Sequence, residues 1–275
     1  MKKMLWIGVI CIIIGGIFCG AAYAVGENYV SANMEFCEDI FNSNDVNRIE
    51  LTQNVANVKF LSGGNSESIK IEAENILIPE YKCSVSDGIL QIKYNPRSVK
   101  FGFVSFPTGI FNINNKMPEI RIYIPAGKKF DEVNFDGGVG KIETTQLNAK
   151  ALMLNGGVGE YNIKGLTTDS LTIESGVGSI KIEGIINGGT KIDGGVGEIK
   201  ISGQINGDID LTTGVGSVEL NLTGNASDYN IKVDKGLGSA KLNGLPVSYV
   251  NNDGKYNINI DAGVGSIDIN IKVMR

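Results

Sequence analysis

The chain has 275 residues, a formal net charge of −5, 42% hydrophobic residues and no histidine. This much hydrophobic material is enough for a folded core, while the lack of histidine excludes His-dependent catalytic triads and Cys/His metal sites. The 37 glycines against 6 prolines, with abundant Ile, Val, Asn and Thr, favour β-structure with frequent tight turns.

Residues 1–26 are expected to anchor the chain in a membrane. Residues 4–25 carry no charge, and as a helix they would span about 33 Å, enough to cross the hydrocarbon core. Two lysines precede this stretch, so the positive-inside rule places the remainder outside the cytoplasm in a single-pass cell-membrane protein. The alternative is a signal peptide cleaved at Ala24, because AYA at residues 22–24 offers a cleavage site. The body is extracytoplasmic in both cases, and secreted in the second.

The exported part is acidic. The first 25 residues contain two lysines and no acidic residue, so the remainder carries 23 basic and 30 acidic residues, a net charge of −7. This charge argues against nucleic acid as a partner and against a basic patch for anionic lipid. Two cysteines lie in this part, Cys37 and Cys83. They could form one disulfide in an oxidising compartment or remain free, and the sequence leaves both alternatives open.

A glycine pair, Gly-x-Gly, recurs along the second half of the chain. The pairs begin at Gly138, Gly157, Gly176, Gly195 and Gly214, a step of 19, and then at Gly236 and Gly263, after steps of 22 and 27. A fixed period of this size indicates a repeat architecture, and the alternation of apolar residues between the pairs indicates short strands. Because 19 residues are too few for an independent sheet, successive coils are expected to stack in parallel, about 4.8 Å apart. The fold class predicted is therefore all-β, a parallel β-solenoid behind one N-terminal transmembrane helix.

Stacking aligns equivalent residues into columns, and two columns are apolar throughout. The first holds the residue between the glycines: Val139, Val158, Val177, Val196, Val215, Leu237 and Val264. The second lies three residues later: Ile142, Tyr161, Ile180, Ile199, Val218, Ala240 and Ile267. We expect both columns to face the interior. The next position is polar and should face solvent, with opposite charges adjacent at Lys200 and Glu219, Glu219 and Lys241, and Lys241 and Asp268.

The solenoid is expected to form one body over residues 46–275. Alternating apolar residues at 49–60, 69–71 and 90–94 indicate less regular coils or paired strands upstream of the glycine repeat. Residues 27–45 are expected to be a linker or a small cap, helical in the second case.

Several stretches of this body resemble the putative adhesin domain family, a domain of unknown function in exported and membrane proteins of Gram-positive bacteria. They are IELTQNVANVKF at residues 49–60, DGILQIKY at 87–94, IRIYIPAGKKFDEVNF at 120–135 and the tandem GVGxIxIxG coils. The resemblance covers about residues 46–275. It implies a right-handed parallel β-solenoid behind an N-terminal membrane segment, a role in the cell envelope and its stress responses, and no catalytic motif.

No enzyme, cofactor or metal site is expected. The glycine pairs do not fit a dinucleotide-binding loop, because a strand follows them instead of a helix. Residues 194–198 resemble a calcium-binding glycine repeat but lack its Asp, and the period is 19 instead of nine. No pair of carboxylates is marked by its spacing as an acid and a base, so a polysaccharide-active enzyme is the least expected alternative.

Two sets of residues are candidates for binding. Tyr229, Tyr249 and Tyr256 lie in the two longer periods, whose insertions share one edge that could hold a glycan or peptide, although ordinary loop variation also explains them. Acidic residues also recur two positions before the glycine pairs. We hypothesise that a row containing Glu174, Asp193, Asp234 and Asp261 collects cations, either calcium or a basic peptide, the alternative being local turn capping.

The function predicted is that of a non-enzymatic envelope protein that displays its solenoid to a glycan, peptide or protein partner, in adhesion or in the envelope stress response. The alternatives are a structural scaffold and a solenoid that polymerises head to tail. Polymerisation would require an unprotected coil at the C-terminal end.

Overall fold

The structure is a computed structural model that describes residues 35–63, 67–96, 98–101, 104–107 and 116–273. Nearly all regular structure in these residues is β, joined by short 3₁₀ turns at η1 (Ser43–Asp45), η2 (Ile78–Glu80) and η4 (Ala226–Asp228). Among the described residues no helix is long and apolar enough to cross a membrane. The predicted anchor at residues 1–26 lies outside the described part of the chain.

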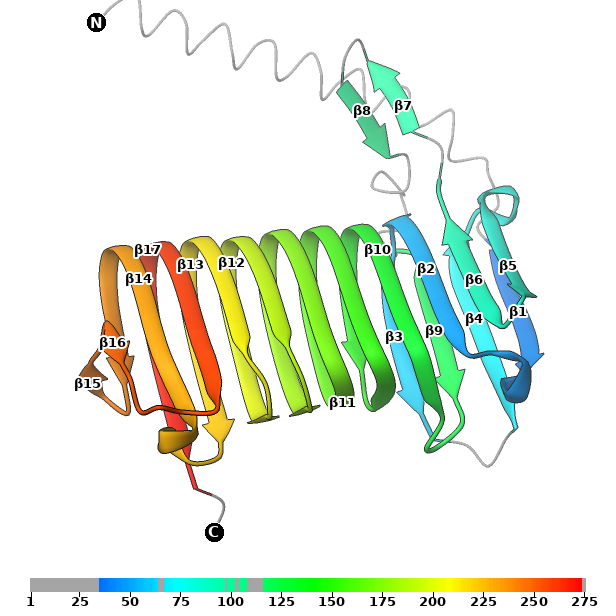
Figure 1. The fold of residues 1–275 in the computed structure, drawn as a ribbon. Helices are drawn as coiled ribbons and strands as arrows, with labels where there is room; N and C mark the ends of the chain where they lie inside the picture. Colours follow the sequence, from blue (N-terminus) through cyan, green and yellow to red (C-terminus); the bar gives the residue numbers. More distant parts are fainter. Residues whose placement is uncertain (1–34, 64–66, 97, 102–103, 108–115, 274–275) are drawn as a thin grey trace, which may run out of the picture.

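A row of stacked coils makes up the C-terminal two thirds of the body (Figure 1). Its long strands bend at the corners of the coils: β10 (Lys129–Thr144), β11 (Leu147–Ile186), β12 (Thr190–Ile205), β13 (Ile209–Thr223), β14 (Tyr229–Leu242) and β17 (Tyr256–Lys272). Neighbouring coils pair in parallel and in the register set by the repeat, so that Val177 lies beside Val196 and Val196 beside Val215. The sequence-based prediction of a parallel, 19-residue coil stack is confirmed here.

The N-terminal strands extend the two walls of the first coil, β10. One wall continues through β2 (Arg48–Val55), β6 (Ile89–Tyr94) and β5 (Tyr81–Ser86). The other continues through β3 (Asn57–Ser62), β9 (Glu119–Ile124), β4 (Ser68–Ile76) and β1 (Glu35–Asn42). The last strands of each wall pair antiparallel, as β5 does with β6 and as β4 does with β9 and β1. A separate hairpin pairs β7 (Ser98–Phe101) with β8 (Val104–Pro107).

Residues 35–42 correct the expectation of a linker or cap helix over 27–45. They form strand β1, which alternates between solvent and interior and pairs antiparallel with β4. Cys37 and Phe41 pack against the core, whereas Phe36 and Ile40 point outward. The alternation in this segment has a period of two, which a strand at the edge of a sheet satisfies and a helix does not.

The core lies between the two walls and runs continuously along the stack. Its side chains include the second apolar column, in which Ile180, Ile199 and Val218 are at most 3% exposed. The inward position of this column is therefore confirmed. At the N-terminal end the fully buried side chains include the larger Phe60, Tyr94 and Phe135.

The last coil of the chain is not the last coil of the stack. Strand β17 pairs with β13 on one side and with β14 on the other, so the chain passes over one coil position, builds β14, and returns to fill the gap. The order of neighbours expected from the sequence changes accordingly. Lys200 and Glu219 form the predicted ion pair at 2.9 Å, but Glu219 lies beside Asp268 instead of Lys241.

Two short strands cover part of the outer edge of β14. They are β15 (Leu245–Pro246) and β16 (Tyr249–Val250), and both pair antiparallel with β14. The turn into β15 uses Asn243 and Gly244, both with positive φ, as a tight hairpin requires. Main-chain groups that an unprotected coil would offer to another molecule are therefore partly satisfied within the chain.

Candidate binding surface

The first apolar column faces solvent, which corrects the expectation that it is interior. Val177, Val196 and Val215 are each 48% exposed, and the terminal Leu237 is 75% exposed. We call this column the valine ridge. In stack order it consists of Val139, Val158, Val177, Val196, Val215, Val264 and Leu237.

The geometry of the glycine corner forces the ridge outward. The second glycine of most pairs has a φ near +150°, for example +150° at Gly178 and +148° at Gly197. A Cβ atom on Gly197 would overlap the carbonyl oxygen of Gly178 in the preceding coil. Glycine backbones therefore pack directly on one another at the corner, and the side chain between them has room only on the outside.

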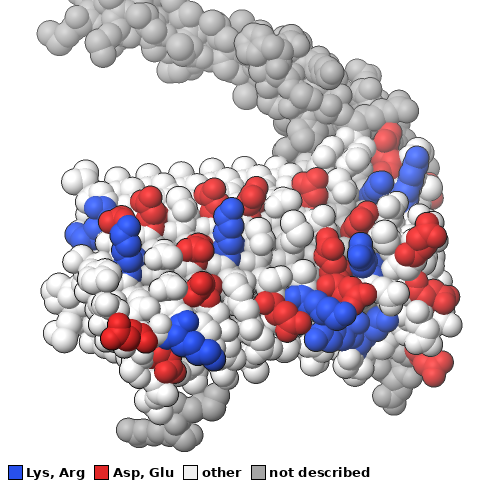
Figure 2. Space-filling model, in the orientation of Figure 1, with Lys and Arg blue, Asp and Glu red and all other residues white. Residues whose placement is uncertain are grey.

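An acidic row runs beside the ridge, two residues before each glycine pair. We define it as Asp136, Asn155, Glu174, Asp193, Thr212, Asp261 and Asp234, in stack order. The structure aligns the four residues predicted to form a cation row: Glu174 is the register partner of Asp193, and Asp234 of Asp261. Figure 2 shows acidic side chains recurring along the upper edge of the stack, where the coils bend in Figure 1.

Most of the acidic row lacks a basic partner. Lys232 contacts Asp234 at 3.0 Å. Within the described residues no Lys or Arg lies within ion-pair distance of Asp136, Glu174, Asp193 or Asp261. Asp136, Glu174 and Asp193 line one shallow groove together with the glycine backbones. Asp234 and Asp261 line a second one together with Lys232.

The opposite flank of the ridge is close to neutral. Lys141 pairs with Glu160 at 2.8 Å, and Lys181 approaches Glu198 at 3.7 Å. The remaining positions on this flank are serines: Ser179, Ser217, Ser266 and Ser239. The ridge is therefore an apolar line with unpaired negative charge on one side only.

The predicted tyrosine edge is not a single surface. Tyr229 is buried, and its hydroxyl donates a hydrogen bond to the carbonyl oxygen of Ile205 at 2.6 Å. Tyr256 is half-buried, with its ring centroid 5.9 Å from that of Tyr229. Tyr249 alone is open to solvent, at 65% exposure. The two insertions lie at the same end of the stack, as expected. Tyr229, however, occupies an inward-facing position of strand β14 and is therefore a core residue.

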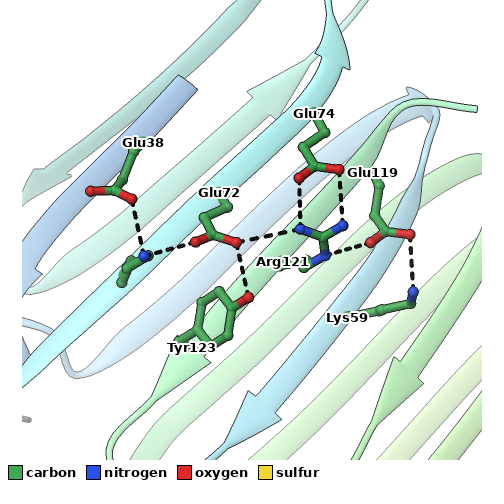
Figure 3. A network of polar contacts seen from close by, with 8 residues as sticks. Glu38, Lys59, Glu72, Glu74, Glu119, Arg121 and Tyr123 are labelled. Carbon is green, nitrogen blue, oxygen red and sulfur yellow. Dashed lines mark hydrogen bonds and ion pairs between the residues drawn. The ribbon is translucent and has the colours of Figure 1, made fainter. Parts of the chain in front are cut away.

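A second concentration of charge crosses the wall of β1, β4, β9 and β3 (Figure 3). Lys70 bridges Glu38 at 3.0 Å and Glu72 at 2.7 Å, and Arg121 holds Glu74 through two hydrogen bonds of 2.8 and 2.9 Å. Hydrogen bonding from Lys70, then from Tyr123 and Arg121, outweighs desolvation and lowers the pKa of Glu72.

Every charge in this network has an opposite charge beside it. Arg121 also contacts Glu119, whose carboxylate accepts from Lys59 at 3.0 Å. A fully paired network leaves little attraction for a ligand, and it instead fixes the register of four strands.

Cys37 and Cys83 lie at the N-terminal end of the stack as free thiols, one on β1 and one on β5. The Cys37 sulfur is 3.8 Å from the Asp39 carboxylate, which also accepts a hydrogen bond from the Tyr81 hydroxyl at 3.0 Å. Burial raises the pKa of Cys83 to about 12 and, with the negative Asp39, also raises the pKa of Cys37. Both thiols are therefore protonated near neutral pH and are weak nucleophiles.

No group of three or more His, Cys, Asp or Glu side chains in the described ranges could hold a metal ion. A Ca²⁺ ion takes six to eight oxygen ligands at about 2.3–2.6 Å, so its ligands must converge on one point. The acidic row cannot provide such a site, because its members lie along a line with one residue per coil. The row is better suited to a partner with charges spread along its length.

The fold and its surface define a class of protein: an all-β stack of coils with a repeated corner and an extended exposed surface. Sequence comparison gives the family. The Toastrack DUF4097 family matches residues 46–272, and the chain belongs to it. No curated protein matches the chain.

Several solved structures are similar to this chain. One is a putative cell adhesion protein from Clostridium sporogenes, 20% identical, with 88% of this chain and 100% of that chain covered and a TM-score of 0.41. Another is a putative adhesin from Bacteroides fragilis, 16% identical, with 87% and 98% covered and a TM-score of 0.37. A third is a putative lipid binding protein from Parabacteroides distasonis, 14% identical, with 89% and 98% covered and a TM-score of 0.29.

Proposed function

We propose that this chain is a non-enzymatic protein of the cell envelope, tethered by its N-terminal segment, whose solenoid presents the valine ridge to a peptide or protein partner outside the cytoplasm. The observation that carries the proposal is the exposure of one apolar residue per coil at the same corner along the stack. An apolar line of this length is costly to leave in water and is typical of an interaction surface.

Polymerisation head to tail is the weaker alternative. It needs an open strand edge at both ends of the stack, and β15 and β16 already pair with β14 at one end. A catalytic role has less support still, since the most concentrated charges belong to the paired network on β1, β4, β9 and β3.

The cellular location is tested by fusing reporters after Arg275 of the full-length chain. Alkaline phosphatase requires export to form its disulfides, so an active fusion is expected, and a fluorescent reporter that matures only in the cytoplasm should stay dark. The reverse result would place the body inside the cell and contradict the proposal.

The binding surface is tested by photo-crosslinking in intact cells. A benzophenone amino acid at Val177 should give a discrete crosslinked product. The same amino acid at Thr167, an exposed position half a coil away in β11, should not. Identical products from both positions, or none from Val177, would mean that the ridge does not meet a partner.

A further inference from the structure

We propose that the partner segment of the valine ridge is a cationic amphipathic helix, seated with its apolar face on the ridge and its basic residues over the acidic row. This inference rests on the proposed function and names the class of ligand. It is drawn from three properties of the surface: the exposed apolar line, the unpaired charge on one flank, and the spacing of the coils.

The apolar line is long enough for several turns of helix. Seven coils spaced about 4.8 Å apart extend over about 29 Å, which is the length of a helix of about 18–20 residues. The residues between the two ends of the line are exposed to a similar extent, from 45% to 51%: Val158, Val177, Val196, Val215 and Val264. A partner lying along the stack can therefore cover several valines at once.

The spacing favours a helix over an extended strand. Successive turns of a helix are about 5.4 Å apart, only about 0.6 Å more than the coils, so a helix drifts by half a coil after about four turns. Alternate residues of an extended strand are about 6.6–6.8 Å apart and lose register within one or two coils.

The charge on the flank selects a basic partner and disfavours a second copy of this chain. Among the residues that the structure describes, no Lys or Arg lies within ion-pair distance of Asp136, Glu174, Asp193 or Asp261, and the other flank is nearly neutral. Two ridges packed on each other antiparallel would bring two acidic rows together, and packed parallel would place each row over a nearly neutral flank, so neither arrangement supplies positive charge to most of the row. A helix with Lys or Arg beside its apolar face would supply that compensation.

The test uses the full-length chain in nanodiscs of zwitterionic phosphatidylcholine, with empty nanodiscs as a blank. The probe is a labelled 18-residue helix of Leu and Lys with one apolar face. Two matched peptides separate the contributions: one replaces Lys with Glu and keeps the apolar face, and the other replaces Leu with Ser and keeps the charge. Saturable binding is expected for the Leu/Lys helix, and binding at least about tenfold weaker for each of the other two.

Two double variants of the protein locate the contact. Val177→Thr with Val196→Thr keeps the β-branched shape and should weaken binding about tenfold. Glu174→Gln with Asp193→Asn should weaken it about three- to tenfold at low salt and less at high salt, because exposed charges are screened. Glu183→Gln with Ile185→Thr is the control, since it changes an exposed acid and an exposed aliphatic residue away from the ridge. An unchanged melting temperature in all three shows that the fold is intact.

The inference is overturned if the Leu/Lys helix does not bind, if the Glu or Ser peptide binds equally well, or if the ridge variants bind like the control. These outcomes are separate from the failure of the proposed function. A crosslink at Val177 together with a Leu/Lys helix that does not bind would contradict only the choice of partner. A body located in the cytoplasm would contradict the proposed function itself.

Discussion

The two columns of the coil stack are both apolar at every position, yet they have opposite environments. Val196 and Ile199 are three residues apart in β12, yet Val196 is 48% exposed and Ile199 is 3% exposed. Between them lies Gly197, whose φ of +148° turns the chain around the corner. The comparison teaches that an apolar column in a solenoid belongs to the core only if the backbone at that position follows the wall, and that a glycine corner reverses the assignment.

Aspartate substitutions test the comparison most directly. Ile199→Asp should lower the free energy of unfolding by about 3–5 kcal/mol, because the carboxylate would be buried without a partner. Val196→Asp should change it by less than about 1 kcal/mol, since the side chain stays in water. Thermal unfolding of the two full-length variants in the same mild detergent measures the difference. Equal losses of stability would show that both columns are interior.

The next largest effect is expected at the glycine that turns the corner. Gly197→Ala should cost about 2–4 kcal/mol, because a Cβ would strain the positive φ and meet the carbonyl oxygen of Gly178. Gly189→Ala is the matched control, since a Cβ there has no atom within 4 Å, and it should stay within about 1 kcal/mol of the wild type. If denaturant midpoints for the two variants coincide, close packing of glycine backbones does not explain the outward ridge.

Tyr229 and Tyr249 give a second comparison of a buried and an exposed side chain, with a smaller expected change in stability. Tyr229→Phe removes the hydrogen bond to the Ile205 carbonyl and should lower the free energy of unfolding by about 1–2 kcal/mol. Tyr249→Phe should have an effect within about 0.5 kcal/mol, because its hydroxyl is in solvent. Chemical denaturation of both variants checks this, and a larger loss at Tyr249 would contradict the buried position of Tyr229.

The smallest effect concerns pH and the charged wall of Figure 3. Lys70 hydrogen bonding lowers the pKa of Glu72, so the carboxylate contributes stability above its unfolded pKa, and this contribution is lost as the pH falls through the lower folded pKa. Glu72→Gln should therefore lose less melting temperature than the wild type between about pH 5 and pH 3. Parallel melting curves for the two proteins over that range would mean that the network adds no net stability.

Much of the coil architecture could be predicted because each repeat has the same pattern of glycines and alternating apolar residues. The step of 19 between glycine pairs and the alternation around Ile180 and Ile199 determine the strands, the parallel register and one wall of the core. The alignment of Glu174 with Asp193 follows from the same period. These features depend on a short pattern that recurs at a fixed step, so a few successive repeats are enough to predict them.

The tertiary structure alone decided which partners the irregular coils meet. Nothing local in the steps of 22 and 27 shows that β17 fills the gap between β13 and β14, because that order depends on where the longer connection can return to the stack. The burial of Tyr229 and the place of β1 on the wall depend in the same way on strands distant in sequence.

The sequence by itself determined the repeat, its period and the β-rich, acidic body. The face of the valine column was decided by the tertiary structure, because hydrophobicity measures what a side chain prefers and not where the backbone can point it. At the corner the glycines of neighbouring coils leave no space inside, so close packing of backbone outweighs the burial of one valine per coil. The result is an apolar ridge in water, which is the surface on which the proposed function depends.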